Sequence, residues 1–391
     1  MPFSQCRIDS LKKALDDLSV GSMYVRDVSN IEWLTGFENV FDEEQAHAMF
    51  VPRQGNRAFL HSDSRYITAL EREAGGTVVE VDAEIIAMSK WARSKYCDLD
   101  ANALNATAVA IEDSISLAEY RQLEKAFKEN GDSDSNEGSS EISFNGHSSL
   151  PFVETQNLIL KLRAVKDDGE IALLKEAQAI TDKAFDHICG FIKPGMTERE
   201  IQLELDDFMM RNGAEGLAFP SIIASGANGA SPHAIVSEKP VKAGECIVMD
   251  FGAKKHGYCS DMTRTIFLGK PDGQMRRAWD VLRQANESVQ GMLKSGVTGK
   301  EAHELALKVL EDGSFAGRMG HGLGHGVGIQ VHELPNLNAK NDKPLEPGNV
   351  VTVEPGIYIP GEFGMRLEDF GVVTKGGFER FTRSTHEMVV L

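Results

Sequence analysis

The sequence predicts two domains: an α/β domain over residues 1–150 and an α+β domain over residues 155–391 that consists of two similar halves. Three observations predict this fold class. Apolar runs alternate with amphipathic segments up to about residue 130, a polar stretch follows, and the remainder contains an internal repeat. A length of 391 residues accommodates two domains of ordinary size.

The first domain is expected to alternate strands and helices. Amphipathic, helix-like stretches at 64–75 and 116–130 lie among short apolar runs. The acidic segment at about 129–149, rich in Ser, Gly and Asn, cannot bury a core, so we expect a surface loop near the domain junction. The strand-like runs are 21–27, 47–53, 57–63, 76–82 and 106–113.

The second domain contains a sequence repeat. Residues 192–209 and 293–310 align without gaps at an offset of 101. Each copy has a Gly-x-Thr turn whose threonine opens the pattern Thr-x-x-Glu, the capping box that starts a helix. The two boxes pair Thr197 with Glu200 and Thr298 with Glu301.

Similar segments flank the two copies of the repeat. An amphipathic helix is expected before each copy, at about 167–190 and 274–293. A glycine-rich loop that contains histidine follows each copy, at 221–233 and 320–333, and strands come after both loops. Two similar halves would meet in a cleft, which is a natural place for a site.

A hairpin in the first half carries two acidic residues. Residues 246–269 are expected to form two strands around a turn within KKHG. If the turn is symmetric about Lys255 and His256, Asp250 lies directly opposite Asp261. Facing residues on antiparallel strands have Cβ atoms about 4.5–5.5 Å apart.

A hairpin in the second half repeats this arrangement. Residues 349–374 fold symmetrically about Gly361, which places Glu354 opposite Glu368. Both registers assume strands without a bulge. Because Asp250 follows the apolar run CIVM and Glu354 interrupts the run VVTVEPGIYI, we expect both carboxylates to be buried.

Two pairs of facing acids in matching places of a repeat predict a metal site. Without a cation, each pair would repel and lose hydration, at a cost of several kcal/mol per buried charge. A single acid in a strand is more often solvated or paired, but that interpretation does not explain two matching pairs. Carboxylates can bridge two metal ions about 3.5–4 Å apart. We therefore expect a dinuclear metal centre.

Histidines from the loop at 320–333 are candidates for the same site. His325 lies mid-loop with a glycine on each side, where the backbone can approach closely. His332 and Glu333 suggest the zinc motif HExxH, but position 336 is asparagine, so that motif fails. Spacing alone does not choose among His321, His325 and His332.

These blocks together resemble a known family. VMDFGAKKHGYCSDMTRT, GHGLGHGVGIQVHE, VTVEPGIY and GMRLEDFG are similar to the prolidase and X-Pro aminopeptidase branch of the pita-bread metallopeptidases. Residues 157–184 resemble the segment that opens that catalytic domain, and the first 130 residues resemble, more weakly, the creatinase-type N-terminal domain. The resemblance implies a pita-bread fold with a pseudo-twofold repeat for residues 155–391.

The resemblance also implies which residues bind metal. Every ligand position of the family is occupied by a matching residue, and the histidine among them is His325. The gap of fourteen residues between the two glutamates is like that of the prolidase branch, whereas methionine aminopeptidases space them further apart. The implied ligands are Asp250, Asp261, His325, Glu354 and Glu368.

Other residues receive roles at the substrate from the same resemblance. It places His233 and His332 beside the substrate as catalytic residues, with Glu354 as the group that moves the proton. It places His321 nearby, and Arg366 where it orients a carboxylate ligand; both are expected to contribute to substrate binding. The alternative for Arg366 is a surface salt bridge, worth about 0–1 kcal/mol. The alternative for His321 is a histidine that only hydrogen-bonds its own loop.

The implied reaction is hydrolysis of X-Pro bonds in short peptides. Oxygen-rich ligation with one imidazole suits Mn²⁺, with Co²⁺ or Zn²⁺ as alternatives. The resemblance implies that two such ions share a hydroxide that attacks the carbonyl carbon. The proline nitrogen has no N–H, so a site that depends on this donor cannot bind the bond, whereas a metal centre does not need it. The resemblance further implies a homodimer.

Composition narrows the partners and the compartment. A net charge of −18 argues against a nucleic acid partner, and the absence of an apolar window of about eighteen residues argues against a membrane span. The N-terminal stretch lacks the apolar core of a signal peptide. Five widely spaced cysteines without a CxxC pair are typical of a reducing compartment, so we expect a cytoplasmic protein.

Two other functions are compatible with such a fold. A different enzyme on the same fold would be a metal-dependent lyase or a creatinase-like C–N hydrolase. Creatinase works without the metals and lacks the full ligand set, so the intact ligands argue against a creatinase-like enzyme but not against a lyase. A non-catalytic binding protein is disfavoured because His233 and His332 accompany those ligands. Fold alone does not separate these functions.

Overall fold

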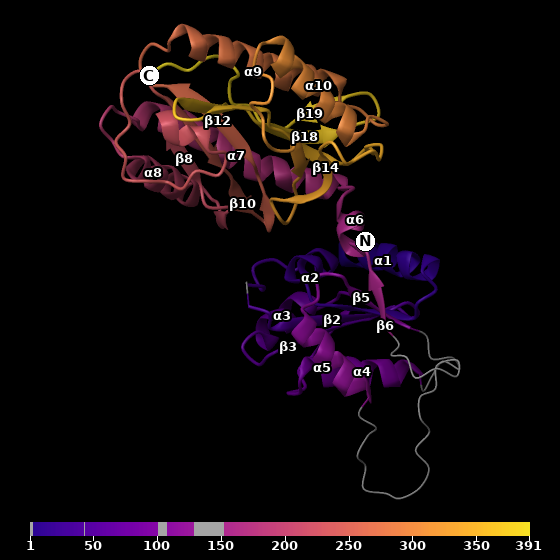
Figure 1. Cartoon of the computed structure of the whole chain (residues 1–391). Helices are drawn as coiled ribbons and strands as arrows, with labels where there is room; N and C mark the ends of the chain where they lie inside the picture. Colours follow the sequence, from indigo (N-terminus) through magenta and orange to yellow (C-terminus); the bar gives the residue numbers. More distant parts are fainter. Residues whose placement is uncertain (1–2, 43, 101–107, 129–151) are drawn as a thin grey trace, which may run out of the picture. The chain divides into compact units, whose positions relative to one another are not determined.

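The computed structural model of the chain describes residues 3–42, 44–100, 108–128 and 152–391. It divides into two compact units, Met1–Leu162 and Arg163–Leu391, which are described separately (Figure 1). The polar loop expected at 129–149 lies outside the described residues.

The N-terminal unit is built on one six-stranded sheet. Its strand order is β4-β3-β2-β1-β5-β6, and each of the five predicted strand runs contains one strand. The sixth strand, β6, was not predicted; it pairs in parallel with β5, so this unit extends beyond residue 150. The strands are β1 Ser22–Val25, β2 His47–Pro52, β3 Ala58–Ser62, β4 Val79–Asp82, β5 Val109–Glu112 and β6 Phe152–Thr155.

Helices cover this sheet and complete its core. Aromatic side chains such as Tyr24, Phe50 and Trp91 are fully buried in one cluster between strands and helices. The predicted helices at 64–75 and 116–130 are confirmed as α3 and α5. The helices are α1 Phe3–Asp17, α2 Val28–Thr35, α3 Ile67–Ala74, α4 Met88–Asp100 and α5 Leu117–Lys128.

The repeat in the C-terminal unit folds into two helix pairs. Both predicted capping boxes are formed, at the starts of α8 and α10. Ile201, Leu205 and Met209 of α8 are buried, and the buried residues of α10 fall at the same offset of 101. The helices are α6 Leu158–Arg163, α7 Asp168–Phe191, α8 Glu198–Arg211, α9 Gly273–Met292 and α10 Gly299–Asp312.

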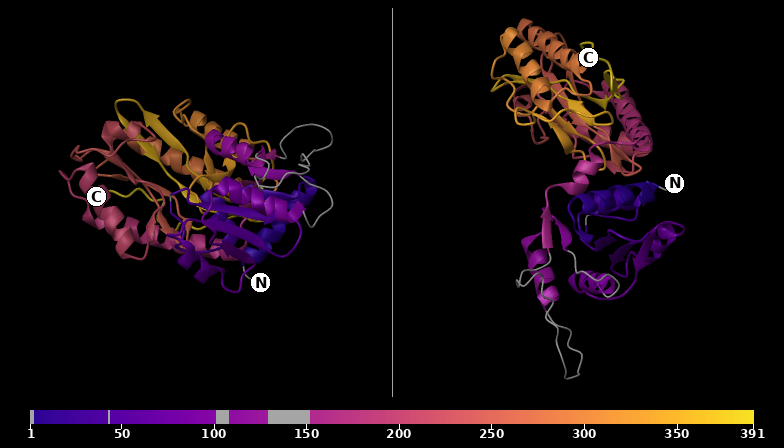
Figure 2. Two further views of the ribbon diagram at one scale, coloured as in Figure 1. Left: turned by 90° about the horizontal axis from the view of Figure 1, so that it is seen from below. Right: turned by 90° about the vertical axis from the view of Figure 1, so that its right-hand side faces the viewer.

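Each helix pair packs on its own set of strands. α7 and α8 contact β7, β8, β10 and β11, whereas α9 and α10 contact strands from β14 to β17. The right-hand view of Figure 2 shows strands between the two helix pairs. The elements are β7 Gly216–Leu217, β8 Ile222–Ser225, η1 Gly226–Ala230, β9 Cys246–Phe251, β10 Ala253–Lys255, β11 Tyr258–Cys259, β12 Met262–Phe267, β13 Gly324–Gly326, β14 Glu333–Leu337, β15 Val350–Val353, β16 Gly356–Ile359, β17 Phe363–Arg366, β18 Asp369–Val373 and β19 Phe378–Arg380.

The register predicted for the first hairpin is wrong. Asp250 pairs with Thr263, not with Asp261. The turn is centred on His256 and Gly257, whose φ angles are 49° and 75°, so it is one residue further along the chain than predicted. Two successive left-handed residues are typical of a tight hairpin turn. Because the shift moves the partner by two residues, Asp261 still lies on the same face of the hairpin as Thr263.

The register predicted for the second hairpin is confirmed. Gly356 pairs with Arg366 in β16–β17, and Val353 pairs with Asp369 in β15–β18. The pairs of both ladders are symmetric about Gly361. Glu354 and Glu368 lie in the short gap between the ladders and therefore face each other.

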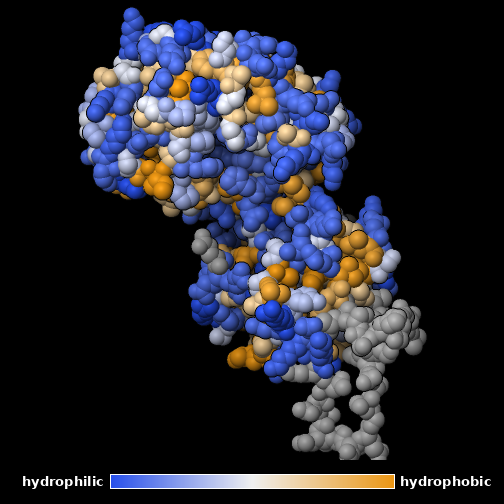
Figure 3. Space-filling model, viewed as in Figure 1, coloured by the Kyte–Doolittle hydropathy of each residue, from blue (hydrophilic) through white to orange (hydrophobic). Residues whose placement is uncertain are grey.

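Figure 3 shows a largely hydrophilic surface on the visible face of the C-terminal unit, with hydrophobic residues in scattered spots. Within the described ranges, no helix has the length and apolar character needed to span a membrane.

Candidate metal centre

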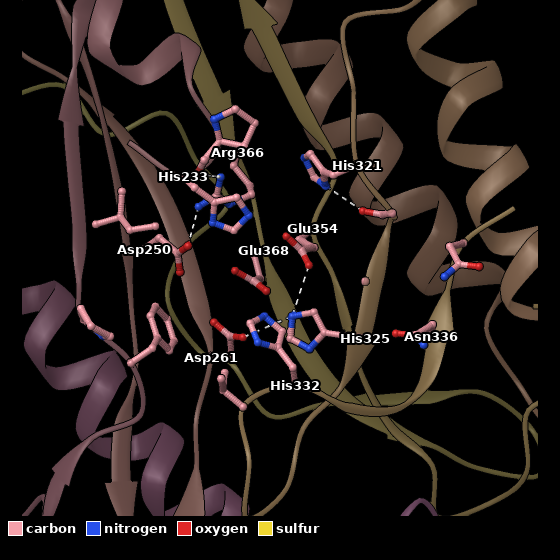
Figure 4. Close-up of a pocket in the computed structure, with 18 residues that line it drawn as sticks. His233, Asp250, Asp261, His321, His325, His332, Asn336, Glu354, Arg366 and Glu368 are labelled. Carbon is pink, nitrogen blue, oxygen red and sulfur yellow. Dashed lines mark hydrogen bonds and ion pairs between the residues drawn. The ribbon is translucent and has the colours of Figure 1, made fainter. Parts of the chain in front are cut away.

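A cavity of about 530 Å³ in the C-terminal unit collects the residues singled out by the sequence. Figure 4 shows their side chains converging on it from both hairpins and from both glycine-rich loops. The nine predicted site residues that line this cavity are His233, Asp250, Asp261, His321, His325, His332, Glu354, Arg366 and Glu368.

Four carboxylates enter the cavity from the ends of strands. Asp250 belongs to β9, and Asp261 immediately precedes β12. In the second half, Glu354 follows β15 and Glu368 precedes β18. The alternation of each strand places these side chains on the face that carries the cavity rather than in the helix-packed core.

Burial makes the full ionisation of these carboxylates unfavourable. Desolvation, followed by the charges of Glu368, Asp250 and Glu354, raises the pKa of Asp261 well above its usual range. Desolvation likewise raises the pKa of Glu354 to about 8 and that of Glu368 well above its ordinary value. Four neighbouring acids are stable as anions only when positive charge lies among them.

His325 presents a lone pair to these acids. Its Nδ1 lies 3.0 Å from the carbonyl oxygen of Gly326, which can only accept, so Nδ1 carries the proton. Burial lowers the pKa of the His325 ring to about 4, so the ring is neutral and Nε2 is an acceptor. Nε2 lies 3.3 Å from Glu354 Oε1 and 3.6 Å from Asp261 Oδ2. Acceptors face one another so closely only with a proton or a cation between them.

The donor atoms also converge within the span of one ion. One ligand atom each from Asp261, His325 and Glu368 lies within 4.8 Å of the others. Asp250 contributes a further acceptor, because its buried Oδ1 has no hydrogen-bond partner among the described residues. Such an orphaned carboxylate oxygen, in a cluster of acids, fits a cation as its missing partner.

Glycine on either side of His325 allows the backbone to reach this position. A Cβ at Gly324 would lie 2.2 Å from the carbonyl oxygen of Thr352, and one at Gly326 would lie 2.2 Å from that of Leu334. Neither position can accept a side chain without moving backbone. The loop therefore presses against β15 and β14 and brings the His325 ring to the carboxylates.

The other histidines surround the acids without joining them. His332 packs against His325 with ring centroids 4.3 Å apart, and burial lowers its pKa. His321 is held by Gly322 O at 2.7 Å from its Nδ1 and by the Tyr358 hydroxyl at 3.1 Å from its Nε2. Burial lowers the pKa of His321 to about 4. Both its ring nitrogens are thus engaged, one within its own loop and the other with β16.

Arg366 is not a surface residue. It is 3% exposed, which excludes the surface salt bridge considered above. Its guanidinium donates to Asp250, to Thr263 Oγ1 at 2.9 Å and to the Tyr358 hydroxyl at 2.9 Å. Thr263 in turn donates to Glu368 Oε2 at 2.7 Å. Arg366 therefore links a carboxylate of each half.

Sequence reasoning missed several residues of the site. Thr263 and Tyr358 accept hydrogen bonds from Arg366, and both lie on the predicted hairpins, so strand period could have indicated them. Asn336 and Asn338 line the cavity from β14 and the residue after it. Their segment, ELPNLN, has no periodicity that distinguishes them.

Comparison with known proteins agrees with this geometry. Residues 172–375 match metallopeptidase family M24, and residues 7–137 match the creatinase/prolidase N-terminal domain. The chain belongs to metallopeptidase family M24. It is thus an enzyme with a creatinase-type N-terminal domain followed by a pita-bread catalytic domain, and the fold class predicted from the sequence is confirmed.

Similar proteins cover nearly the whole length of this M24 peptidase. An uncharacterized peptidase of Bacillus subtilis (strain 168) is 32% identical over 98% of this chain and 100% of its own length. An Xaa-Pro dipeptidase from Bacillus anthracis has a TM-score of 0.86 and 32% identity, and covers 99% of this chain and 100% of that one. An X-Pro aminopeptidase from Thermotoga maritima MSB8 has a TM-score of 0.81 and 30% identity, over 97% and 100%.

The family implies divalent metal ions, and the residues present fit them. The cavity offers carboxylate oxygens and one neutral imidazole nitrogen, the ligand types that hard and borderline divalent ions take. The unpartnered Asp250 Oδ1 and the raised carboxyl pKa values indicate the same missing positive charge.

Proposed function

We propose that this protein hydrolyses X-Pro peptide bonds in short peptides, as an Xaa-Pro dipeptidase or Xaa-Pro aminopeptidase. The observation that carries the proposal is the convergence of Asp261, His325 and Glu368 in one cavity. The names of the relatives support X-Pro as the cleaved bond, since one is an Xaa-Pro dipeptidase and another an X-Pro aminopeptidase.

In this proposal two divalent ions are held by five residues, and Mn²⁺ is the preferred metal, with Co²⁺ or Zn²⁺ as alternatives. When bound, the ions would supply a water of lowered pKa and positive charge beside the peptide carbonyl. The ligands would be Asp250, Asp261, His325, Glu354 and Glu368.

Glu354 is proposed to move the proton of the reaction. It faces the cavity, and burial raises the pKa of its carboxyl to about 8 in the metal-free protein, so it holds a proton readily. A carboxylate there can accept the proton of the attacking water and return it to the departing proline nitrogen.

His233 and His332 are proposed to stabilise the carbonyl oxygen as it becomes negative. Both line the cavity, and neither bonds to a carboxylate within the described part of the chain. Burial lowers the pKa of His332, so its neutral ring can offer an N–H to the developing oxyanion.

His321 and Arg366 are proposed to bind substrate. Both hold the Tyr358 hydroxyl, at 3.1 Å and 2.9 Å. Both also line the cavity, in which a peptide would lie. Arg366 acts in addition on Asp250, whose orientation it sets.

The proposal also includes a cytoplasmic homodimer that acts on short proline-containing peptides. All five cysteines are free, which agrees with a reducing compartment. The homodimer rests on the family resemblance and is checked by the molar mass of the purified protein in solution.

The function is tested on chelator-treated protein resupplied with Mn²⁺. Proline release from an X-Pro dipeptide is measured beside cleavage of an X-Pro-containing tripeptide, with Asp261→Ala as the control. We expect Mn²⁺-dependent hydrolysis that the variant loses, and the preferred length distinguishes dipeptidase from aminopeptidase. Two equivalents of bound metal without turnover of either peptide would reject the peptidase and favour a lyase or another small-molecule reaction.

A further inference from the structure

A buried glutamate that does not line the cavity accepts hydrogen bonds from both ends of the loop that carries His233. Glu198, the first residue of α8, is 0% exposed. Its Oε1 accepts from the backbone N–H and the hydroxyl of Ser225, both at 2.8 Å. Its Oε2 accepts from the backbone N–H of Ser237 at 3.2 Å and from its hydroxyl at 2.6 Å. The Asn228 amide donates to both oxygens.

His233 has no comparable support of its own. No hydrogen bond to its ring is found within the described part of the chain, so the path of the backbone sets where the ring lies. Glu198 bonds to that backbone at both ends, at Ser225 together with the β8–β9 ladder and at Ser237 together with the Arg199 N–H, which donates to Ser237 O at 3.1 Å. Between them, Pro232 O accepts from Arg366 at 3.3 Å. Figure 4 shows His233 close to Arg366 at the cavity.

These contacts require a carboxylate, and a neutral side chain of the same size would not replace it. Every partner of the Glu198 carboxylate donates, and each end of the loop uses its own carboxylate oxygen. A glutamine would turn an N–H₂ group toward one backbone N–H, either that of Ser225 or that of Ser237. A backbone N–H cannot reverse, so one end would lose its acceptor and leave a buried donor unpaired.

The internal repeat shows that these contacts of Glu198 are not part of ordinary helix capping. The capping-box residues Thr197 and Glu200 recur in the second half, but the counterpart of Glu198 at offset 101 is Gly299. A Cβ at Gly299 would lie 2.3 Å from Asn336 O, so no glutamate fits there. Starting the helix therefore does not require Glu198, and its partners belong to the loop of the first half alone.

We propose that Glu198 is a positioning residue of the peptidase site, which fixes both ends of the segment 225–237 and thereby the place of His233 in the cavity. The inference rests on the proposed function for its effect on turnover. The fixing of the loop does not depend on that function.

The first test measures hydrogen–deuterium exchange of the full-length, metal-free protein. We expect Glu198→Gln to raise deuterium uptake in peptides spanning 225–237 and to leave the loop at 320–333 unchanged. Glu200→Gln, an exposed capping-box residue on the same helix, is the matched control and should leave 225–237 protected. Ser237→Ala, which removes one hydroxyl, gives a smaller change in the same segment if Glu198→Gln does not fold. Unchanged uptake at 225–237 in the variant that folds overturns the inference.

The second test is a double-mutant cycle on X-Pro dipeptide hydrolysis with Mn²⁺. We expect Glu198→Gln to lower kcat by roughly 10²-fold through misplacement of His233, with the metal content unchanged. In a His233→Ala background the same change should cost almost nothing, because the group that it positions is gone. Full additivity, or loss of metal, would show a general structural role and reject the positioning of His233.

The two tests separate the inference from the function. If the wild-type protein hydrolyses no X-Pro peptide, the proposed function fails, and the exchange result alone decides whether Glu198 fixes the loop. If the wild type is active and His233→Ala has full activity, His233 has no role in turnover and the positioning proposal is rejected, while the peptidase assignment stands.

Discussion

Arg366 donates to only one of the two carboxylate oxygens of Asp250, and the other oxygen is buried without a partner among the described residues. The guanidinium thus fixes the orientation of the carboxylate and leaves its second oxygen free for a cation. The same guanidinium donates to Tyr358 and Thr263, so the buried Arg366 side chain holds residues from both halves of the domain.

Replacement of Arg366 should destabilise the metal-free protein. Arg366→Met leaves Asp250 as an uncompensated buried charge, which costs about 3–5 kcal/mol in the free energy of unfolding. Urea unfolding of chelator-treated protein measures this cost. Arg211→Met, which removes a largely exposed arginine paired with Asp207, is the control and should change stability by less than about 0.5 kcal/mol. Equal effects of the two substitutions would contradict the structural role of Arg366.

Asp261→Asn should lose metal without unfolding. The amide keeps the volume of the side chain but offers a neutral oxygen to a site that needs anionic ligands, so we expect fewer than two bound Mn²⁺ per chain. Metal analysis after dialysis and titration calorimetry give the stoichiometry. Asp280→Asn, an exposed position on α9, should retain the wild-type value. Retention of both ions by Asp261→Asn would exclude Asp261 as a ligand.

Metal affinity should rise with pH and then level off. In the metal-free protein the pKa of Glu354 is raised to about 8, so its carboxyl is protonated at pH 6–7 and must release a proton to bind metal. The pKa of His325, lowered to about 4, keeps that ring neutral throughout. We expect proton release at pH 7 that decreases as the pH rises through about 8. Calorimetry in buffers of different ionisation enthalpy measures it, and pH-independent affinity would contradict the prediction.

Glu333 should stabilise the loop that carries His325 and His332. Its side chain is 1% exposed and pairs with Arg163 and with Lys166, the latter at 2.9 Å. Glu333→Gln leaves two buried cations without their anion, at about 3–5 kcal/mol in the free energy of unfolding at pH 7. Glu379→Gln, which breaks an exposed pair with Lys175, should cost less than about 1 kcal/mol.

The cost of Glu333→Gln should shrink in acid. Lys166 and Arg163 hold the pKa of Glu333 at about 2, below its unfolded value. A depressed carboxyl pKa contributes stability above the unfolded pKa, and that contribution is lost as pH falls toward the folded pKa. The difference in unfolding free energy between wild type and variant should therefore be constant from pH 7 to about 5.5 and decrease below about 4.5. A constant difference down to pH 3.5 would contradict the ion pairing.

The elements that depend on near neighbours in the chain were predictable. Capping boxes, helix periodicity and apolar strand runs involve residues a few positions apart, so α8, α10 and the first five strands followed from pattern. The turn of the first hairpin marks the limit of this reasoning. Its register depends on which two residues of KKHG adopt the left-handed conformation, and composition did not distinguish His256–Gly257 from its neighbours.

By itself, the sequence determined the repeat, the two acid-bearing hairpins and nine of the residues that line the cavity, because strand period and family motifs depend on residues close together in the chain. Only the tertiary structure decided which groups meet. Glu333 and Arg163 are 170 residues apart, Arg366 and Asp250 are 116 apart, and Glu198 reaches across 39 residues to Ser237. Those contacts depend on how the two halves and their loops pack. Packing is a property of the whole domain that no single stretch of chain encodes.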